Sequence, residues 1–151
     1  MRLIAVGRLR PGPEADLFRR YSDRLRPRLE VVEVAEGVGA PGEIKRREGE
    51  ALLAALPRDA FAVALDLGGV APTSEALAAL LESWLAGGRK LAFVIGGADG
   101  LSAALLARAD HVMSLGPLTW PHMLARVMLA EQLFRARAIA SGHPYHRAGR
   151  P

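Results

Sequence analysis

Short, almost uninterrupted apolar runs separated by segments of helical spacing constrain the fold of this chain most. The clearest runs are Phe61–Leu67 (FAVALDL) and Leu91–Ile95 (LAFVI), and a third aliphatic run, Arg2–Gly7, stands near the start. Strands buried on both faces of a parallel sheet have this composition, because both of their sides pack against apolar side chains. Strands that alternate with helices predict an α/β domain with a mostly parallel sheet flanked by helices. We expect residues 1–151 to form a single domain.

Proline, glycine and capping residues mark the helices between these strands. Pro27 and Pro57 each stop a helical pattern, Thr73 suits an N-cap, and Gly87 follows a helix end. The expected helices are Pro13–Arg26, Glu43–Leu56, the segment from the Thr73 cap to Leu85, Ser102–Arg108 and Pro121–Ala140, and the further strands are Leu29–Ala35 and His111–Leu115.

The composition excludes several classes of site. The chain has no cysteine, so disulfides, thiolate nucleophiles and cysteine-ligated zinc or iron–sulfur sites are excluded. The histidines do not have the spacing of a metal-ligand motif, and we expect no metal site. The apolar patch after Met1 is too short for a signal peptide, and no apolar run reaches the length of a membrane span. We therefore expect a soluble cytoplasmic protein.

The charge balance is basic. The formal net charge is +4 and, among 20 basic residues, only Lys45 and Lys90 are lysine. A basic domain suits an anionic partner such as nucleic acid. An arginine bias is equally typical of a GC-rich genome or a hot habitat, so the charge alone leaves both explanations open.

Three loops after strands have an unusual content for simple turns: LDLGG at 65–69, IGGADG at 95–100 and SLGPLTWPH at 114–122. In a parallel α/β sheet, ligands bind beyond the carboxyl ends of the strands, where such loops gather. Glycines allow a ligand to approach the backbone closely, which suits a nucleoside cofactor. The loops have neither the dinucleotide spacing GxGxxG nor a phosphate-binding GxxxxGK[ST] motif.

The last thirty or so residues join a long helix to a tail rich in functional groups. Arg126, Glu131 and Arg135 form the expected polar side of the helix, whose apolar surface is wider than one core contact needs. We therefore expect the helix to contact a second subunit. The tail HPYHR, residues 143–147, combines two histidines, a tyrosine and an arginine. These groups bind anions, stack on bases and transfer protons.

With the loops and the tail taken together, the sequence resembles the SPOUT superfamily of RNA methyltransferases, and within it the ribosomal large subunit methyltransferase H family. The shared motifs run along essentially the whole chain: VG after the first strand, LD at 65–66, IGG at 95–97, LT-PH, AR, EQL-RA and the closing PYHR. The resemblance implies a homodimer that methylates N3 of a pseudouridine in a 23S ribosomal RNA hairpin with S-adenosylmethionine, on the ribosome rather than on DNA. It also implies a C-terminal trefoil knot, an exception to the rule against threaded chains.

Residue by residue, the resemblance assigns two groups of positions. The cofactor-binding positions match Leu65, Gly97, Gly116, Pro117, Leu118, Thr119, Trp120 and Pro121. The positions associated with catalysis and the acceptor RNA match Arg135, Tyr145, His146 and Arg147. The chain departs from the family's usual residues at Ala98 and Asp99, and at Trp120, where we expect altered packing around the adenine.

The acceptor nitrogen implies a mechanism, because an imide N–H is a poor nucleophile until it loses its proton. We expect His146 to accept that proton, Arg147 or Arg135 to stabilise the anionic base or hold a phosphate, and Tyr145 to stack on the base. Two alternatives stay open: a non-catalytic, basic ribosome-binding or assembly protein, and a SPOUT methyltransferase for another RNA. Tight binding of S-adenosylmethionine would favour an enzyme over the first alternative.

Overall fold

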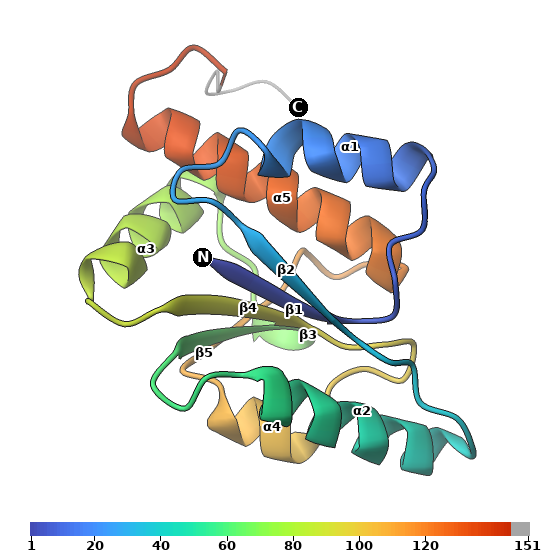
Figure 1. Ribbon diagram of the computed structural model, residues 1–151. Helices are drawn as coiled ribbons and strands as arrows, with labels where there is room; N and C mark the ends of the chain where they lie inside the picture. Colours follow the sequence, from blue (N-terminus) through green and yellow to red (C-terminus); the bar gives the residue numbers. More distant parts are fainter. Residues whose placement is uncertain (146–151) are drawn as a thin grey trace.

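The computed structural model (Figure 1) describes residues 1–145, in which five parallel strands form one sheet in the order β2-β1-β4-β3-β5. This confirms the predicted α/β fold. In these residues the strands are β1 (Arg2–Val6), β2 (Glu30–Val34), β3 (Phe61–Val70), β4 (Leu91–Ile95) and β5 (His111–Met113), and the helices are α1 (Pro13–Ser22), α2 (Pro41–Ala55), α3 (Ser74–Ala86), α4 (Ala103–Arg108) and α5 (His122–Ala140). None of these helices is long and apolar enough to cross a membrane.

Helices cover both faces of the sheet, which explains why its central strands are apolar on both sides. Figure 1 shows α1, α3 and α5 on one face and α2 and α4 on the other. In β1, Leu3 and Ala5 belong to the core under α1, α3 and α5, whereas Ile4 and Val6 belong to the core on the opposite face. The four side chains are fully buried, so each successive residue of the strand has to be apolar.

Side-chain caps begin two of the helices where the sequence predicts them. The Thr73 side chain accepts a hydrogen bond from the backbone N–H of Ala76 at 3.1 Å, and the Ser102 side chain accepts one from Leu105 at 3.3 Å. These bonds satisfy N–H groups that have no partner within the first helical turn. The caps place α3 and α4 directly after the loops that follow β3 and β4.

Strand β3 is longer than the predicted Phe61–Leu67, because its pairing with β5 resumes after an irregularity. Leu65 pairs with Met113, and Val70 pairs with the same residue after the shift in register. Gly69 packs so closely on the backbone of β5 that a Cβ there would lie 2.7 Å from Met113 atoms. The extension depends on a contact between distant segments, which local sequence patterning does not report.

Two predicted helix boundaries move, and one side chain is placed wrongly by the sequence. Helix α1 ends at Ser22 instead of Arg26, with a following turn in which the Leu25 N–H donates to the Ser22 carbonyl at 3.2 Å. Helix α2 begins at Pro41, two residues before the predicted start. Arg126 was expected on a polar side of α5, but it is fully buried.

An ionic network fastens β5 to β3 at the amino end of these strands. The Asp110 carboxylate accepts a hydrogen bond from the Ala62 N–H at 2.8 Å and two from the Arg89 guanidinium at 2.8 and 3.1 Å. Burial alone would raise the pKa of the Asp110 carboxyl, but the hydrogen bonds and charges of Arg89 and Arg108 outweigh it and hold the pKa below its ordinary value of 3.8.

We expect Asp110→Asn to lower the free energy of unfolding by about 1–3 kcal/mol near neutral pH, because it removes charged hydrogen bonds. A carboxyl whose pKa is lower in the folded state stabilises the fold above its ordinary pKa, and this contribution is lost as the pH falls through the folded-state pKa. Thermal unfolding of both proteins should therefore show a steady difference in Tm from about pH 6 to 8 that shrinks below about pH 4. A difference in Tm that did not change with pH would contradict this assignment.

Candidate functional site

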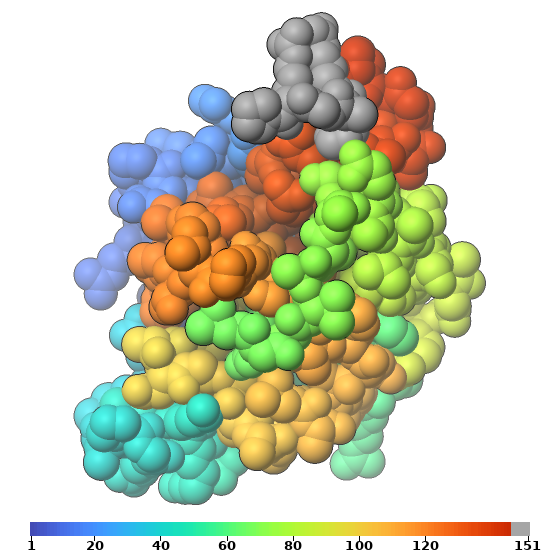
Figure 2. Space-filling model, turned by 180° about the vertical axis from the view of Figure 1, so that it is seen from behind, coloured from blue at the N-terminus to red at the C-terminus, as the bar shows by residue number. Residues whose placement is uncertain are grey.

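The irregular second half of β3, from Leu65 on, and the loops after β4 and β5 meet and form a pocket at the carboxyl edge of the sheet. Figure 2 shows the green, yellow and orange segments that contain them side by side on one face of the molecule. The pocket has a volume of about 200 Å³. Its lining residues are Leu65, Asp66, Leu67, Ile95, Gly96, Gly97, Ala98, Gly100, Ser114, Leu115, Gly116, Leu118, Thr119, Trp120, His122 and Ala125. The three segments singled out in the sequence thus form one site, although 65–69 lies within β3 and not in a loop after it.

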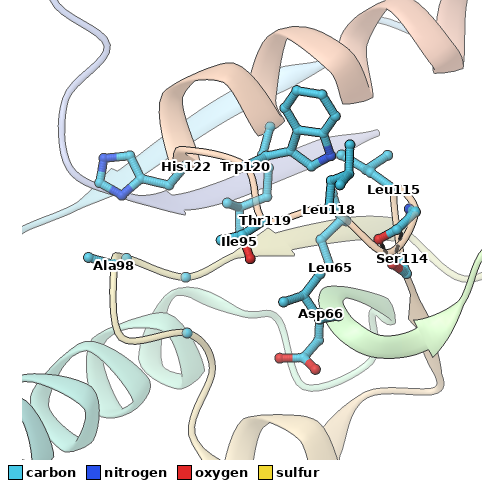
Figure 3. Close-up of a pocket in the computed structure, with 16 residues that line it drawn as sticks. Leu65, Asp66, Ile95, Ala98, Ser114, Leu115, Leu118, Thr119, Trp120 and His122 are labelled. Carbon is cyan, nitrogen blue, oxygen red and sulfur yellow. Dashed lines mark hydrogen bonds between the residues drawn. The ribbon is translucent and has the colours of Figure 1, made fainter.

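The pocket has an apolar interior with polar groups at its edges. Figure 3 shows Leu118 and Trp120 on the side of the loop that enters α5, and Asp66 on the side of β3. Asp66 Oδ1 accepts a hydrogen bond from the Gly68 N–H at 2.9 Å, so its carboxylate is held at the irregularity in β3. Apolar walls suit a planar base, and the exposed backbone and carboxylate groups suit hydrogen bonds to its edge and to ribose hydroxyls.

The loop before α5 is shaped by a hydrogen-bonded turn at Ser114. Its hydroxyl donates to the Gly116 carbonyl at 2.8 Å, and its oxygen accepts a hydrogen bond from the Gly116 N–H at 3.2 Å. Ser114 is buried, so the turn is fixed from within the fold. The exposed residues that follow in the same loop, Leu118 and Trp120, line the pocket.

Most of the predicted cofactor-binding residues line the pocket. They are Leu65, Gly97, Gly116, Leu118, Thr119 and Trp120. Pro117 and Pro121 do not line it; Pro121 is the N-cap of α5, and its carbonyl accepts the Ala125 N–H at 2.9 Å. Sequence reasoning did not name Asp66, Ser114 and His122, although they lie in the loops that it selected, and Ala125 carries no local signal because it lies on a helix.

Arg135 and Tyr145 lie together, but away from the pocket. The Glu131 carboxylate accepts a hydrogen bond from Arg135 at 2.5 Å and another from the Tyr145 hydroxyl at 3.0 Å. The Arg135 guanidinium lies 5.1 Å from the centre of the Tyr145 ring, and the Phe134 ring meets that ring edge-on at 4.8 Å. Glu131 therefore fixes both groups on one side of α5.

This cluster also sets the protonation of its members. The hydrogen bond to Glu131 raises the pKa of Arg135. Burial, followed by hydrogen bonds with Tyr21 and Glu131, raises the pKa of the Tyr145 hydroxyl well above its usual range. Arg135 is therefore a permanent cation, and Tyr145 remains a neutral donor at physiological pH.

The cluster and the pocket lie at different ends of α5. Since a helix rises about 1.5 Å per residue, Arg135 is about 20 Å along the axis from His122, which lines the pocket. Within one chain, Arg135 and Tyr145 are thus not positioned over the bound ligand of their own pocket. His146 and Arg147, the other two predicted residues, lie outside the described residues.

Comparisons with known proteins agree with the fold and the site. Residues 1–146 match the family described as "Predicted SPOUT methyltransferase". The chain is similar to Ribosomal RNA large subunit methyltransferase H of Gluconacetobacter diazotrophicus, with 68% identity over 100% of this chain and 99% of the relative. It is also similar to the protein of that name from Acidiphilium cryptum, with 60% identity over 100% of this chain and 96% of the relative.

A solved structure supports the fold alone. It is that of a probable methylase family protein from Haemophilus influenzae, with a TM-score of 0.59 and 12% identity over 99% of this chain and 71% of that one. The family match, in contrast, spans nearly every residue, and the relatives named above align along the whole chain. The chain therefore belongs to the SPOUT methyltransferases, within the ribosomal RNA large subunit methyltransferase H family.

Proposed function

We propose that this protein transfers a methyl group from S-adenosylmethionine to N3 of a pseudouridine in 23S ribosomal RNA. The observation that carries the proposal is the convergence of the three strand-end loops on one pocket, in a chain that is 68% identical to a ribosomal RNA large subunit methyltransferase H. The pseudouridine and its N3 atom come from the family resemblance. We further propose that the protein acts in the cytoplasm on the assembled ribosome.

The residues of the pocket fit the cofactor. Leu65, Ile95 and Leu118 would contact the adenine, and Asp66 stands where a carboxylate can accept hydrogen bonds from ribose hydroxyls. Gly97 lines the pocket, where its backbone would contact the ligand. When bound, S-adenosylmethionine would supply an electrophilic methyl group on a sulfonium.

The other proposed site residues would bind and activate the acceptor base of the RNA. The cationic Arg135 would stabilise the anionic base formed when N3 loses its proton, or would hold a phosphate. The Tyr145 ring would stack on the base, and its hydroxyl is held by Glu131. His146 would accept the proton from N3, and Arg147 would assist Arg135.

A homodimer would bring the two groups of residues together. Arg135 is about 20 Å along α5 from the pocket in the same chain, so the cluster of one subunit would have to complete the pocket of another. Leu67, Leu118 and Trp120 are exposed apolar side chains that line the pocket, where a partner would cover them. The homodimer and the C-terminal trefoil knot are proposals that follow from family membership.

The proposal is tested by methyl transfer from radiolabelled S-adenosylmethionine to complete ribosomes, free large subunits and naked 23S RNA, with the modified nucleotide then mapped. We expect transfer to N3 of one pseudouridine, most efficiently on complete ribosomes. Transfer to a different RNA would favour the alternative that the protein is a SPOUT methyltransferase for another RNA. Ribosome binding without transfer to any of the three substrates would favour the non-catalytic ribosome-binding protein and overturn the proposal.

His146→Ala is expected to slow single-turnover methylation about 100-fold or more at saturating cofactor, because it removes the proposed proton acceptor. Rapid quenching of one methyl-transfer cycle on ribosomes measures this rate. His143→Ala is the comparison variant: it changes another histidine of the same tail and removes only the acceptor of the Tyr145 N–H, so we expect a much smaller loss of rate. A near-normal rate for His146→Ala would show that another group accepts the proton.

A further inference from the structure

A buried carboxylate, Glu48 on α2, lies directly behind the pocket wall formed by the β4–α4 loop. Only 4% of Glu48 is exposed, and its Oε1 accepts a hydrogen bond from the Gly37 N–H at 2.9 Å. Its Oε2 is buried and has no hydrogen-bond partner among the residues that the structure describes. Burying a carboxylate oxygen without a partner costs free energy, so this placement calls for a physical explanation.

The free oxygen is packed against Gly97, which lines the pocket. A Cβ added to Gly97 would lie 2.5 Å from Glu48 Oε2 and 3.0 Å from Glu48 Oε1. The position of this Cβ shows that one side of Gly97 faces Glu48, while the residue also contributes to the pocket surface. Glu48 thus contacts the loop from below and leaves the ligand-facing side of the loop clear.

We propose that Glu48 is a positioning residue for cofactor binding. Its side chain determines the distance between α2 and the loop that contains Gly97. This inference rests on the proposed function, because it assigns the ligand of the pocket as S-adenosylmethionine. The carboxylate is hydrogen-bonded to Gly37, in the loop before α2, and packs closely against Gly97, in the loop after β4. Removing it lets the Gly97 loop settle toward α2, which widens the pocket and weakens the contacts that the loop makes with the cofactor.

The first test measures cofactor binding by calorimetry with the wild-type protein and with Glu48→Ala. We expect Glu48→Ala to raise the Kd for S-adenosylmethionine about tenfold, because the loop loses its support. Glu50→Ala, on the same helix, is the matched control: Glu50 is exposed and pairs with Arg46 at 2.6 Å, and its removal should leave the Kd unchanged. Methylation by Glu48→Ala should show a higher KM for cofactor, with the KM for ribosomes unchanged.

The second test uses the tight contact itself. Gly97→Ala should raise the Kd about tenfold in the wild-type background, because its methyl group meets the carboxylate and pushes the loop out of place. In the Glu48→Ala background, Gly97→Ala should cause little further increase in the Kd, since the methyl group occupies the space that the Glu48 side chain has left. If Glu48→Ala fails to fold, Glu48→Asp takes its place, because its shorter side chain withdraws the carboxylate by about 1.5 Å. It should likewise reduce the effect of Gly97→Ala on the Kd.

The outcomes separate this inference from the proposed function. Absence of S-adenosylmethionine binding by the wild-type protein would overturn both. Binding by the wild type, with independent effects of the substitutions at Glu48 and Gly97, would overturn the role of Glu48 alone. A fall in Tm for Glu48→Ala with an unchanged Kd would likewise overturn it, because Glu48 would then stabilise the fold without positioning the cofactor loop.

Discussion

Replacing Arg126 with alanine is expected to lower the free energy of unfolding by about 3–5 kcal/mol, because it leaves two buried carbonyls and the partly buried Glu33 carboxylate without their donor. Arg126 is fully buried, and it donates to Glu33 at 2.8 Å, to the Gly7 carbonyl at 2.6 Å and to the Val6 carbonyl. Burial lowers the pKa of Arg126, but Glu33 offsets part of this shift. The side chain thus fastens α5 to the carboxyl end of β1, and alanine leaves those acceptors without their donor.

Urea unfolding at fixed protein concentration measures this loss. Glu33→Gln removes only the partner charge, and because 29% of the Glu33 side chain is exposed, we expect a cost of about 1 kcal/mol. The loss of unfolding free energy for Arg126→Lys should lie between those for Arg126→Ala and Glu33→Gln, since one ammonium group does not reach all the acceptors that the planar guanidinium reaches. A loss below about 1 kcal/mol for Arg126→Ala would show that water replaces the side chain at these carbonyls.

The parts of the fold that the sequence predicts are those specified by local patterns. Phe61–Leu67 and Leu91–Ile95 were identified as strands because burial on both faces requires a nearly continuous apolar run. Thr73 was identified as a helix N-cap because its side chain can satisfy a free N–H group, and the structure shows the same role for Ser102. The pocket followed from the same logic, since loops after parallel strands gather at one edge of the sheet.

The features that escaped prediction depend on contacts between distant segments. Arg126 has the spacing of an exposed helical residue, and only its partners 93 or more residues away explain its burial. Glu48 gives no signal in a charged helix, because its role depends on Gly97 in another loop. The distance between the pocket and the cluster at Glu131 was equally hard to predict from the sequence. The motif residues of the pocket and of the cluster are close in the sequence, but the long helix α5 separates them in space.

That distance leads to a complementation experiment between two inactive variants. Ala125→Phe places a ring in the pocket and is expected to weaken cofactor binding about 10- to 100-fold, and Arg135→Ala should slow methylation about 100-fold. If the cluster of one subunit completes the pocket of the other, a heterodimer of the two variants has one fully intact site. We therefore expect heterodimers, purified through two different affinity tags, to recover about half of the wild-type activity.

An arrangement within one chain predicts the opposite result. Each site of the heterodimer would then carry either the blocked pocket or the missing arginine, and no activity would return. Thermal unfolding of each parent variant checks that it is folded, and cofactor calorimetry checks that Arg135→Ala keeps its pocket. The experiment is decisive because both arrangements contain the same two pockets and the same two clusters, and only their pairing across the subunit boundary decides whether an unblocked pocket is paired with an intact Arg135.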